Sequence, residues 1–419
     1  MKSLPQDTLT PVRSRFFYGW VVVGISTVMM AITYGLMYSY GVFFKPLAEY
    51  FNWDRATVSA IYSASLIIRG AISIGTGWLA DRYGAARLMA FCGFMIGLGL
   101  ILSGQVRELW QLFITYAIIE AIGLSGTFGI ATAITSRWFT KNRGLALGIV
   151  SCGTGLGTLI IVPGAERLIA ATDWSKAFII IGMIAGIIMI SASFFLKPPP
   201  AGQSVKNLIV LKTEHAQDPS ENINMPFAAA IRSPRMILLI SVFILIFFCT
   251  QLVIVHLVNN ATDRGINPFV AASLISIIGL VGIAGRLTMG IGADKLGIYN
   301  TLILCSSLLA LALILLTFTN SLWTFYLFAA AFGFAYGGEV PLIPLFISHF
   351  FGIRSMAALM GFLLFISNIG GALGPWVGGK IYDLTGSYRI AFLIGAIAGI
   401  ILLLMSIVLK KFARKEVKA

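Results

Sequence analysis

Four charged side chains lie in the middle of long apolar stretches of this sequence: Arg69, Glu120, Arg286 and Glu339. A charged group at the centre of a bilayer costs several kcal/mol, so such residues tend to serve substrates, ions or protons. The guanidinium of an arginine is always protonated, and its parallel N–H groups match a carboxylate. We therefore interpret Arg286 as the group that binds a carboxylate. The competing interpretation is a structural arginine that neutralises Glu339, which lies at a similar predicted depth.

The two acidic residues are candidates for carrying a proton. Burial disfavours the charged form of a carboxyl group and a nearby arginine favours it, so an anion that occupies the arginine promotes protonation. We favour Glu339 over Glu120 for this role because its predicted depth is close to that of Arg286. The alternative for Glu120 is a structural ion pair with Arg69, which lies in the same half of the chain.

Neutral polar residues in the same apolar stretches complete the predicted binding site. Tyr34 and Tyr38 lie in the first stretch, Tyr336 in the tenth and Asn368 in the eleventh. Their hydroxyl and amide groups can hydrogen-bond the oxygens of a substrate. A polar residue in a membrane helix also commonly joins one helix to another, and this alternative applies to each of the four.

Histidines and cysteines offer no metal site in the sequence. The four cysteines each lie inside an apolar stretch without paired spacing, so neither a disulfide nor a zinc site is indicated. His256 is expected at the membrane interface, near the outer end of its helix. We expect no metal and no cofactor.

Twelve apolar stretches must position these residues. Each is long enough for a helix to cross the hydrocarbon core of a bilayer, which takes roughly 20 residues. Their predicted ranges are 16–43, 55–78, 84–104, 108–135, 143–165, 175–196, 235–260, 269–291, 298–319, 321–347, 354–378 and 387–409. Of the chain's 419 residues, 58% are hydrophobic and only 11% are charged. This composition excludes a soluble enzyme, a secreted disulfide scaffold and a nucleic-acid-binding module.

The sequence thus predicts an all-α membrane protein with 12 transmembrane helices in two pseudo-symmetric six-helix bundles. We assign residues 1–196 to the first bundle, 197–234 to a linker rich in charge and proline, and 235–419 to the second bundle. Most of the 30 Lys and Arg residues fall on the side that carries the termini and the linker. Basic residues concentrate in cytoplasmic loops, so both termini are predicted to be cytoplasmic.

The two halves repeat a loop motif after the second and eighth stretches. Gly77-Trp-Leu-Ala-Asp81-Arg82-Tyr-Gly84 aligns with Gly290-Ile-Gly-Ala-Asp294-Lys295-Leu-Gly297. Basic side chains at these helix ends can satisfy terminal carbonyl groups. We interpret Asp81, Arg82, Asp294 and Lys295 as gating residues whose contacts break as the bundles rock; the alternative is a simple topology anchor.

These motifs carry a resemblance to a known family. The chain resembles the major facilitator superfamily and, within it, the monocarboxylate transporters and their bacterial relatives, which include oxalate–formate exchangers. The matching stretches are Tyr18-Gly19-Trp20, Gly41-Val-Phe-Phe-Lys45-Pro46, 138–148, Gly285-Arg286-Leu-Thr-Met-Gly290 and Gly374-Pro375. The resemblance implies the major facilitator fold, rocker-switch alternating access, and binding of the substrate carboxylate by Arg286.

Two positions depart from the pattern of that family. Monocarboxylate transporters commonly carry an aspartate one turn before the arginine and a lysine in the first span. Here these positions hold Gly282 and Tyr38. If transport is coupled to protons, another acidic residue must therefore take part, and Glu339 and Glu120 are available.

The sequence favours a secondary transporter of a small monocarboxylate such as lactate or pyruvate, by proton symport. The alternative is an organic anion exchanger of the oxalate–formate type, in which Arg69 supplies a second cation; drug efflux is less favoured. Neither a P-loop nor a catalytic triad occurs in the spans, so we do not expect an enzyme. Expected partners are a small organic anion, a proton and membrane lipid, but no nucleic acid, for a functional monomer in a cell inner membrane.

Overall fold

Twelve long helices dominate the structure. A computed structural model describes residues 17–139, 143–199, 225–351 and 356–416, and within these ranges it holds helices and no strand. Within the same ranges, 12 helical segments are long and apolar enough to cross a membrane. The prediction of an all-α protein with 12 transmembrane helices is confirmed.

The helices of the first half are α1 Gly19–Phe51, α2 Arg55–Tyr83, α3 Ala85–Ser103, α4 Leu109–Leu112, the π-helix η1 Phe113–Glu120, α5 Ala121–Trp138, α6 Arg143–Ala171 and α7 Trp174–Ser193. Those of the second half are α9 Phe227–Ile231, α10 Pro234–Asp263, α11 Pro268–Leu296, α12 Ile298–Phe318, α13 Leu322–Glu339, α14 Leu342–Phe351, α15 Met356–Thr385 and α16 Arg389–Glu416. The short helix α9 lies within the segment predicted as a linker.

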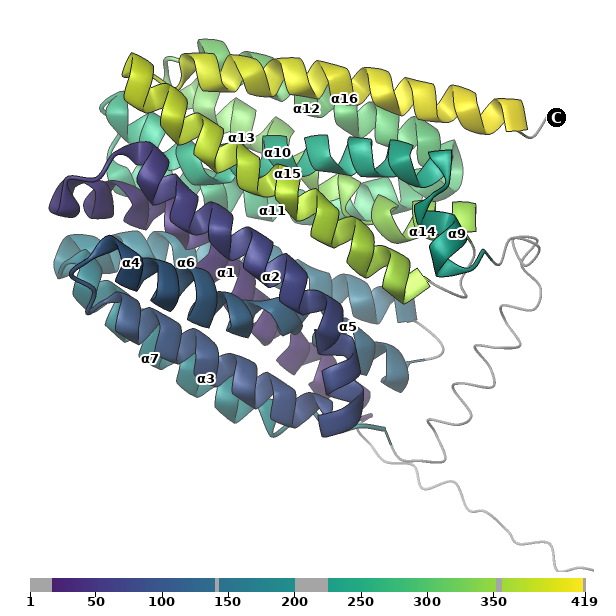
Figure 1. Cartoon of the computed structure of the whole chain (residues 1–419), viewed down its shortest axis with the longest axis horizontal. Helices are drawn as coiled ribbons and strands as arrows, with labels where there is room; N and C mark the ends of the chain where they lie inside the picture. The colour runs from purple at the N-terminus through teal and green to yellow at the C-terminus, as the bar shows by residue number, and fades with distance from the viewer. Residues whose placement is uncertain (1–16, 140–142, 200–224, 352–355, 417–419) are drawn as a thin grey trace, which may run out of the picture.

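The helices form two groups that lie side by side (Figure 1), with α1 to α7 in one bundle and α10 to α16 in the other. Helix α2 packs along α15, and α6 packs along α11, so these four helices form most of the junction between the bundles. We call the end at which α1 begins and α7 ends the linker end, and the opposite end the far end.

The repeated loop motif has the same backbone geometry in both halves. Gly84 ends α2 with φ 89°, and Gly297 ends α11 with φ 83°. L-amino acids with a Cβ rarely adopt this left-handed region, whereas glycine does so at little cost. Each glycine lets the next helix start at once, which explains why the motif ends on glycine in both halves.

Two of the predicted spans are not continuous α-helices. The tenth is broken between Glu339 and Leu342, where Pro341 lacks the N–H group that would continue the helical hydrogen bonds. The fourth contains the π-helix η1, which ends at Glu120. Both irregularities fall next to a buried acidic residue.

Glycines bring α11 and α13 into close contact beside Arg286. A Cβ on Gly337 would lie 2.7 Å from the Cα of Gly282, and a Cβ on Gly282 would lie 3.3 Å from the carbonyl oxygen of Gly333. Small residues at such crossings let two membrane helices approach through their backbones. Gly282 thus lies at a close helix crossing, where a side chain would press on the backbone of α13.

The Gly337→Ala substitution should destabilise the fold, because its new Cβ meets backbone that cannot move aside. Overpacking of this kind costs roughly 1–3 kcal/mol, and we expect a lower melting temperature in detergent. The matched control is Gly24→Ala, since a Cβ on Gly24 has no neighbour within 4 Å. Equal melting temperatures for the two variants would contradict the close crossing.

Candidate functional site

Arg286 of α11 reaches across the junction to the first bundle. Its Nη1 donates to the carbonyl oxygen of Ser151 at 3.2 Å and to the hydroxyl of Thr154, both on α6. Its Nε is buried and has no hydrogen-bond partner among the described residues. Within the same part of the chain no ion pair joins Arg286 to a carboxylate. The guanidinium therefore keeps its charge and a free donor.

Tyrosines from both bundles gather next to this arginine. The hydroxyl groups of Tyr38 on α1 and Tyr336 on α13 lie 2.6 Å apart and form a hydrogen bond between the bundles. The guanidinium of Arg286 lies 5.9 Å from the centre of the Tyr336 ring, within cation–π range. The ring of Tyr34 stands edge-on to that of Tyr38 at 6.0 Å. The structure thus brings together four of the residues predicted to bind substrate.

Asn368 lies a helix away from this group, on α15. Its side-chain amide donates to the carbonyl oxygen of Leu364 at 2.9 Å, one turn earlier in the same helix. It also packs against Gly70 of α2, since a Cβ there would lie 3.3 Å from its Nδ2. Asn368 therefore lies at the junction between α15 and α2, against Gly70.

Arg69 of α2 lies near two of the groups already described. It acts electrostatically on Tyr34, as Arg286 does from the other bundle, and also on Tyr62 and on Glu120. The hydroxyl of Tyr62 donates to Gln251 of α10 at 3.2 Å, across the junction. The predicted ion pair between Arg69 and Glu120 is not among those formed by the described residues.

Glu339 and Glu120 are both completely enclosed. Glu120 is 0% exposed and Glu339 is 1% exposed, and the carboxyl oxygens of both have no hydrogen-bond partner among the described residues. Glu339 lies at the end of α13 near the thiols of Cys249 and Cys305 rather than near a basic group. The sequence predicted similar depths for Glu339 and Arg286, but no contact between the two is found among the described residues.

The repeated loop motif is only partly described. The side chains of Asp81 and Asp294 lie outside the described residues. Arg82 and Lys295 are exposed at the linker end, and the guanidinium of Arg82 lies 5.6 Å from the centre of the Tyr83 ring. Their gating role stays a prediction.

His256 is enclosed by other side chains rather than exposed at the membrane interface. The residue is 0% exposed, and its Nε2 lies 2.8 Å from the carbonyl oxygen of Pro375 on α15. The rings of Phe44 and Tyr388 flank it at centroid distances of 5.4 and 4.8 Å. Phe44 belongs to α1 and Tyr388 to the second half of the chain, so His256 is packed where the two bundles meet.

A cluster of charges at the far end joins the two bundles. In the sequence these residues resemble ordinary charges near helix ends, so the cluster was not predicted. Arg55 of α2 pairs with Asp263 of α10 at 2.7 Å, and Lys45 of α1 approaches the same carboxylate at 3.5 Å. Asp383 of α15 accepts from the backbone N–H groups of Arg55 and Ala56 at 2.8 and 2.7 Å, at the start of α2. We call Lys45, Arg55, Asp263 and Asp383 the far-end cluster.

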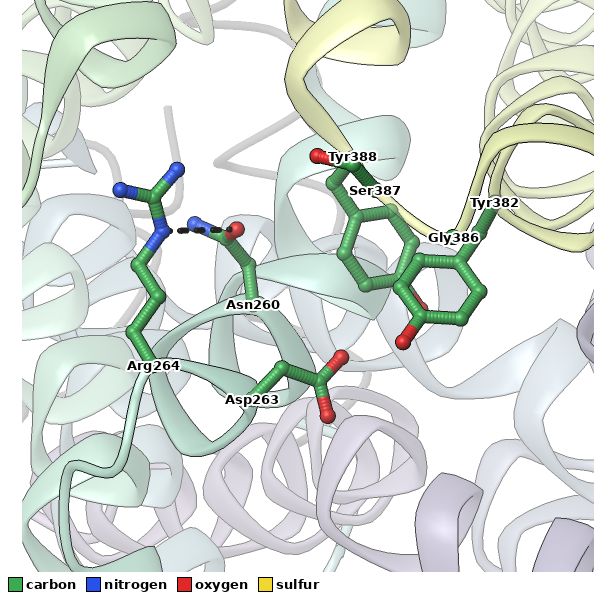
Figure 2. A pocket seen from close by; sticks show the side chains of 7 residues that line it. All are labelled: Asn260, Asp263, Arg264, Tyr382, Gly386, Ser387 and Tyr388. Atoms are coloured by element: carbon green, nitrogen blue, oxygen red, sulfur yellow. Dashed lines mark hydrogen bonds between the residues drawn. The ribbon is translucent and has the colours of Figure 1, made fainter.

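Aromatic rings and a pocket flank this cluster. The Arg55 guanidinium lies 3.6 Å from the centre of the Tyr382 ring and donates to the Tyr388 hydroxyl at 2.6 Å. A pocket of about 250 Å³ adjoins the cluster. Figure 2 shows its lining, with the α10 side chain of Asp263 on the side facing Tyr382 and Tyr388. In the wall of this pocket, the Nε of Arg264 donates to the side-chain oxygen of Asn260 at 3.4 Å. The far end is therefore closed by contacts between the bundles.

Comparison with known proteins agrees with this architecture. The family model described as Major Facilitator Superfamily matches residues 26–320 and 261–419. The chain belongs to the Major Facilitator Superfamily. It is thus a multi-pass membrane protein of a superfamily of transporters. The structure superposes on the crystal structure of the nucleoside transporter NupG with a TM-score of 0.71 and 17% identity, covering 94% of this chain and all of that one.

Similar sequences within the superfamily include carriers of organic anions. Human Monocarboxylate transporter 12 is 25% identical, with 95% of this chain and 80% of that protein covered. Mouse Monocarboxylate transporter 11 is 26% identical, with 90% and 84% covered. The Oxalate:formate antiporter of Oxalobacter formigenes is 26% identical, with 91% and 89% covered. The resemblance noted from the sequence is confirmed.

The hydrogen bond between Tyr38 and Tyr336 yields a stability prediction. Tyr38→Phe and Tyr336→Phe should each lower the melting temperature, because each leaves one buried hydroxyl without its partner. The double variant should lose about 1 kcal/mol less than the sum of the two, as expected for residues in contact.

The matched control for this cycle is Tyr40→Phe. The Tyr40 hydroxyl donates to the carbonyl oxygen of Val58 at 2.6 Å, within the first bundle. The loss of stability in Tyr40→Phe should add to the loss in Tyr336→Phe. Strict additivity for Tyr38 and Tyr336 as well would show that the two hydroxyl groups do not interact in the folded protein.

Proposed function

We propose that this protein is a secondary active transporter of a small monocarboxylate such as lactate or pyruvate, coupled to protons. The observation that carries the proposal is Arg286, a permanent cation among tyrosines at the junction of the bundles, with a buried Nε donor left unused. A carboxylate can accept from this donor, while the hydroxyl groups of Tyr38 and Tyr336 can turn from one another toward its oxygens. The names of the similar transporters support the same substrate class.

Transport in this proposal follows rocker-switch alternating access. Arg286 on α11 donates hydrogen bonds to Ser151 and Thr154 on α6. An anion bound to the guanidinium therefore lies next to both bundles. The far-end cluster closes one entrance, and its contacts must break before the site can face that side. The excess of basic residues at the linker end supports a cytoplasmic location for that end and for both termini, in a cell inner membrane.

The alternative is an exchanger of organic anions of the oxalate–formate type. The observation that favours it is the second cation, Arg69, because both Arg69 and Arg286 act on Tyr34. A dianion could then neutralise both guanidinium groups. Counterflow that requires an internal anion, with no effect of an imposed pH gradient, would favour exchange over symport.

Arg286→Lys should strongly weaken specific binding and uptake of labelled lactate in proteoliposomes. Lysine keeps the charge but loses the fork geometry, and loss of a buried hydrogen-bonded charge contact costs about 2–5 kcal/mol, or roughly 30-fold or more in affinity. The matched control is Arg389→Lys, since Arg389 is exposed at the far end. Wild-type affinity in Arg286→Lys would refute the assignment of the binding group.

The far-end cluster yields a separate prediction about conformation. Asp263→Asn should weaken the closed far end, because the Arg55 and Asp263 side chains are only 14% and 20% exposed and their pairing spans the bundles. A loss of about 1 kcal/mol changes the ratio of the two conformations about five-fold. Spin labels at Tyr50 and Leu384, both exposed near that end, should report a larger fraction of long distances.

The control for this measurement is Asp173→Asn. Asp173 pairs with Lys176 at 3.0 Å within the first bundle, so its loss removes an ion pair without releasing the junction. The distance distribution should then match that of the wild type. If Asp263→Asn also matches the wild type, the far-end cluster is not a gate.

A further inference from the structure

The buried residue Glu120 occupies an irregular segment of its helix. It is the last residue of the π-helix η1, and π-helical turns are rare and frequently mark functional sites. Its backbone is pressed against α3, where a Cβ on Gly99 would lie 2.6 Å from its nitrogen. This contact fixes the backbone of Glu120, and its carboxyl group is fully enclosed with no donor to either oxygen among the described residues.

A charged carboxylate without donors in such a place is costly, whereas a protonated carboxyl group is much less so. The charged or titratable groups that act on Glu120 come from two elements. They are Arg69 and Tyr62 of α2 and Tyr116 of η1 itself. The facing part of α3 contributes the backbone at Gly99. Arg69 is thus the one cation among these groups, and it opposes protonation of Glu120.

Arg69 also connects Glu120 to the region that receives the anion. Tyr34 packs on Tyr38 of that region. The charges of Arg69 and of Arg286 both act on Tyr34. An anion bound there offsets part of the positive potential of Arg69. Less opposition to protonation then remains at Glu120, so anion binding and proton binding strengthen each other.

Glu339 lacks this connection. It is as deeply buried as Glu120, but its neighbours are the thiols of Cys249 and Cys305, and no basic side chain among the described residues acts on it. The route by which the anion acts on Glu120 through Arg69 therefore has no counterpart at Glu339. Burial alone therefore does not distinguish the two residues, but the position of Arg69 does.

We infer that Glu120 and Arg69 form the proton-binding site of this transporter, distinct from the arginine that holds the substrate anion. The inference rests on the proposed function and selects one of the two acidic residues. The proton binds a carboxyl oxygen of Glu120 as the anion binds, and both leave on the opposite side of the membrane. Arg69 is a positioning residue that acts through Glu120.

The test is isothermal titration calorimetry of purified protein with lactate, in two buffers of different ionisation enthalpy at one pH. The buffer dependence of the heat gives the protons taken up, and we expect up to about one per lactate in the wild type. Glu120→Gln should bind lactate with no proton uptake, and Arg69→Gln should show much less uptake than the wild type. Glu166→Gln, a half-buried acid on α6, is the control that keeps the wild-type value.

Three results would overturn the inference. These are unchanged uptake in Glu120→Gln, loss of uptake in Glu339→Gln instead, and wild-type binding of lactate without any proton. The last result leaves carboxylate transport standing and refutes only the proton site, whereas absence of lactate binding in the wild type refutes the proposed function.

A second measurement observes the proton directly. The infrared difference spectrum between lactate-bound and lactate-free protein should gain the carbonyl band of a buried protonated carboxyl group, and this gain should be missing in Glu120→Gln. Glu120→Asp, which keeps a carboxyl group, should retain a gain even if Glu120→Gln folds poorly. A gain that persists unchanged in Glu120→Gln overturns the proton site.

Discussion

The bilayer cannot solvate a charge, and this constraint governs the centre of the molecule. Arg286 meets it by donating from α11 to the carbonyl oxygen of Ser151 and the hydroxyl of Thr154 on α6. Neutral acceptors stabilise the guanidinium without cancelling its charge, whereas a carboxylate partner would cancel it. The attraction for an anion is therefore retained exactly where the two bundles meet, because the groups that solvate the cation belong to the opposite bundle.

Much of the fold follows from patterns that are local in the sequence. Apolar stretches of membrane-spanning length predict the 12 helices, and the glycines that end the repeated motif, Gly84 and Gly297, adopt the same left-handed conformation. The break at Pro341 was also visible as a proline, but hydropathy does not register it because the flanking residues are apolar. The π-helix at Glu120 leaves no such mark, since one extra residue per turn depends on how α3 packs against it.

The site was predictable in its residue types but not in its pairings. A cation and tyrosines within apolar helices point to Arg286, Tyr38 and Tyr336, which the structure brings together. Their order in space depends on contacts between residues hundreds of positions apart, which no periodicity encodes. The pairing of Arg55 with Asp263 was missed for this reason, because each residue taken alone resembles an ordinary charge at the end of a helix.

Two acidic residues that are equally buried can have different roles. Glu339 and Glu120 are equally enclosed, and a depth argument from helix length ranked Glu339 first. Coupling, however, requires that substrate binding change the free energy of protonation, and a charge that acts on both sites provides this link. Arg69 is such a charge for Glu120, since it also acts on Tyr34 beside the anion region. Because position 282 holds glycine and not an acid, the proton site that we propose lies in the other bundle, at Glu120.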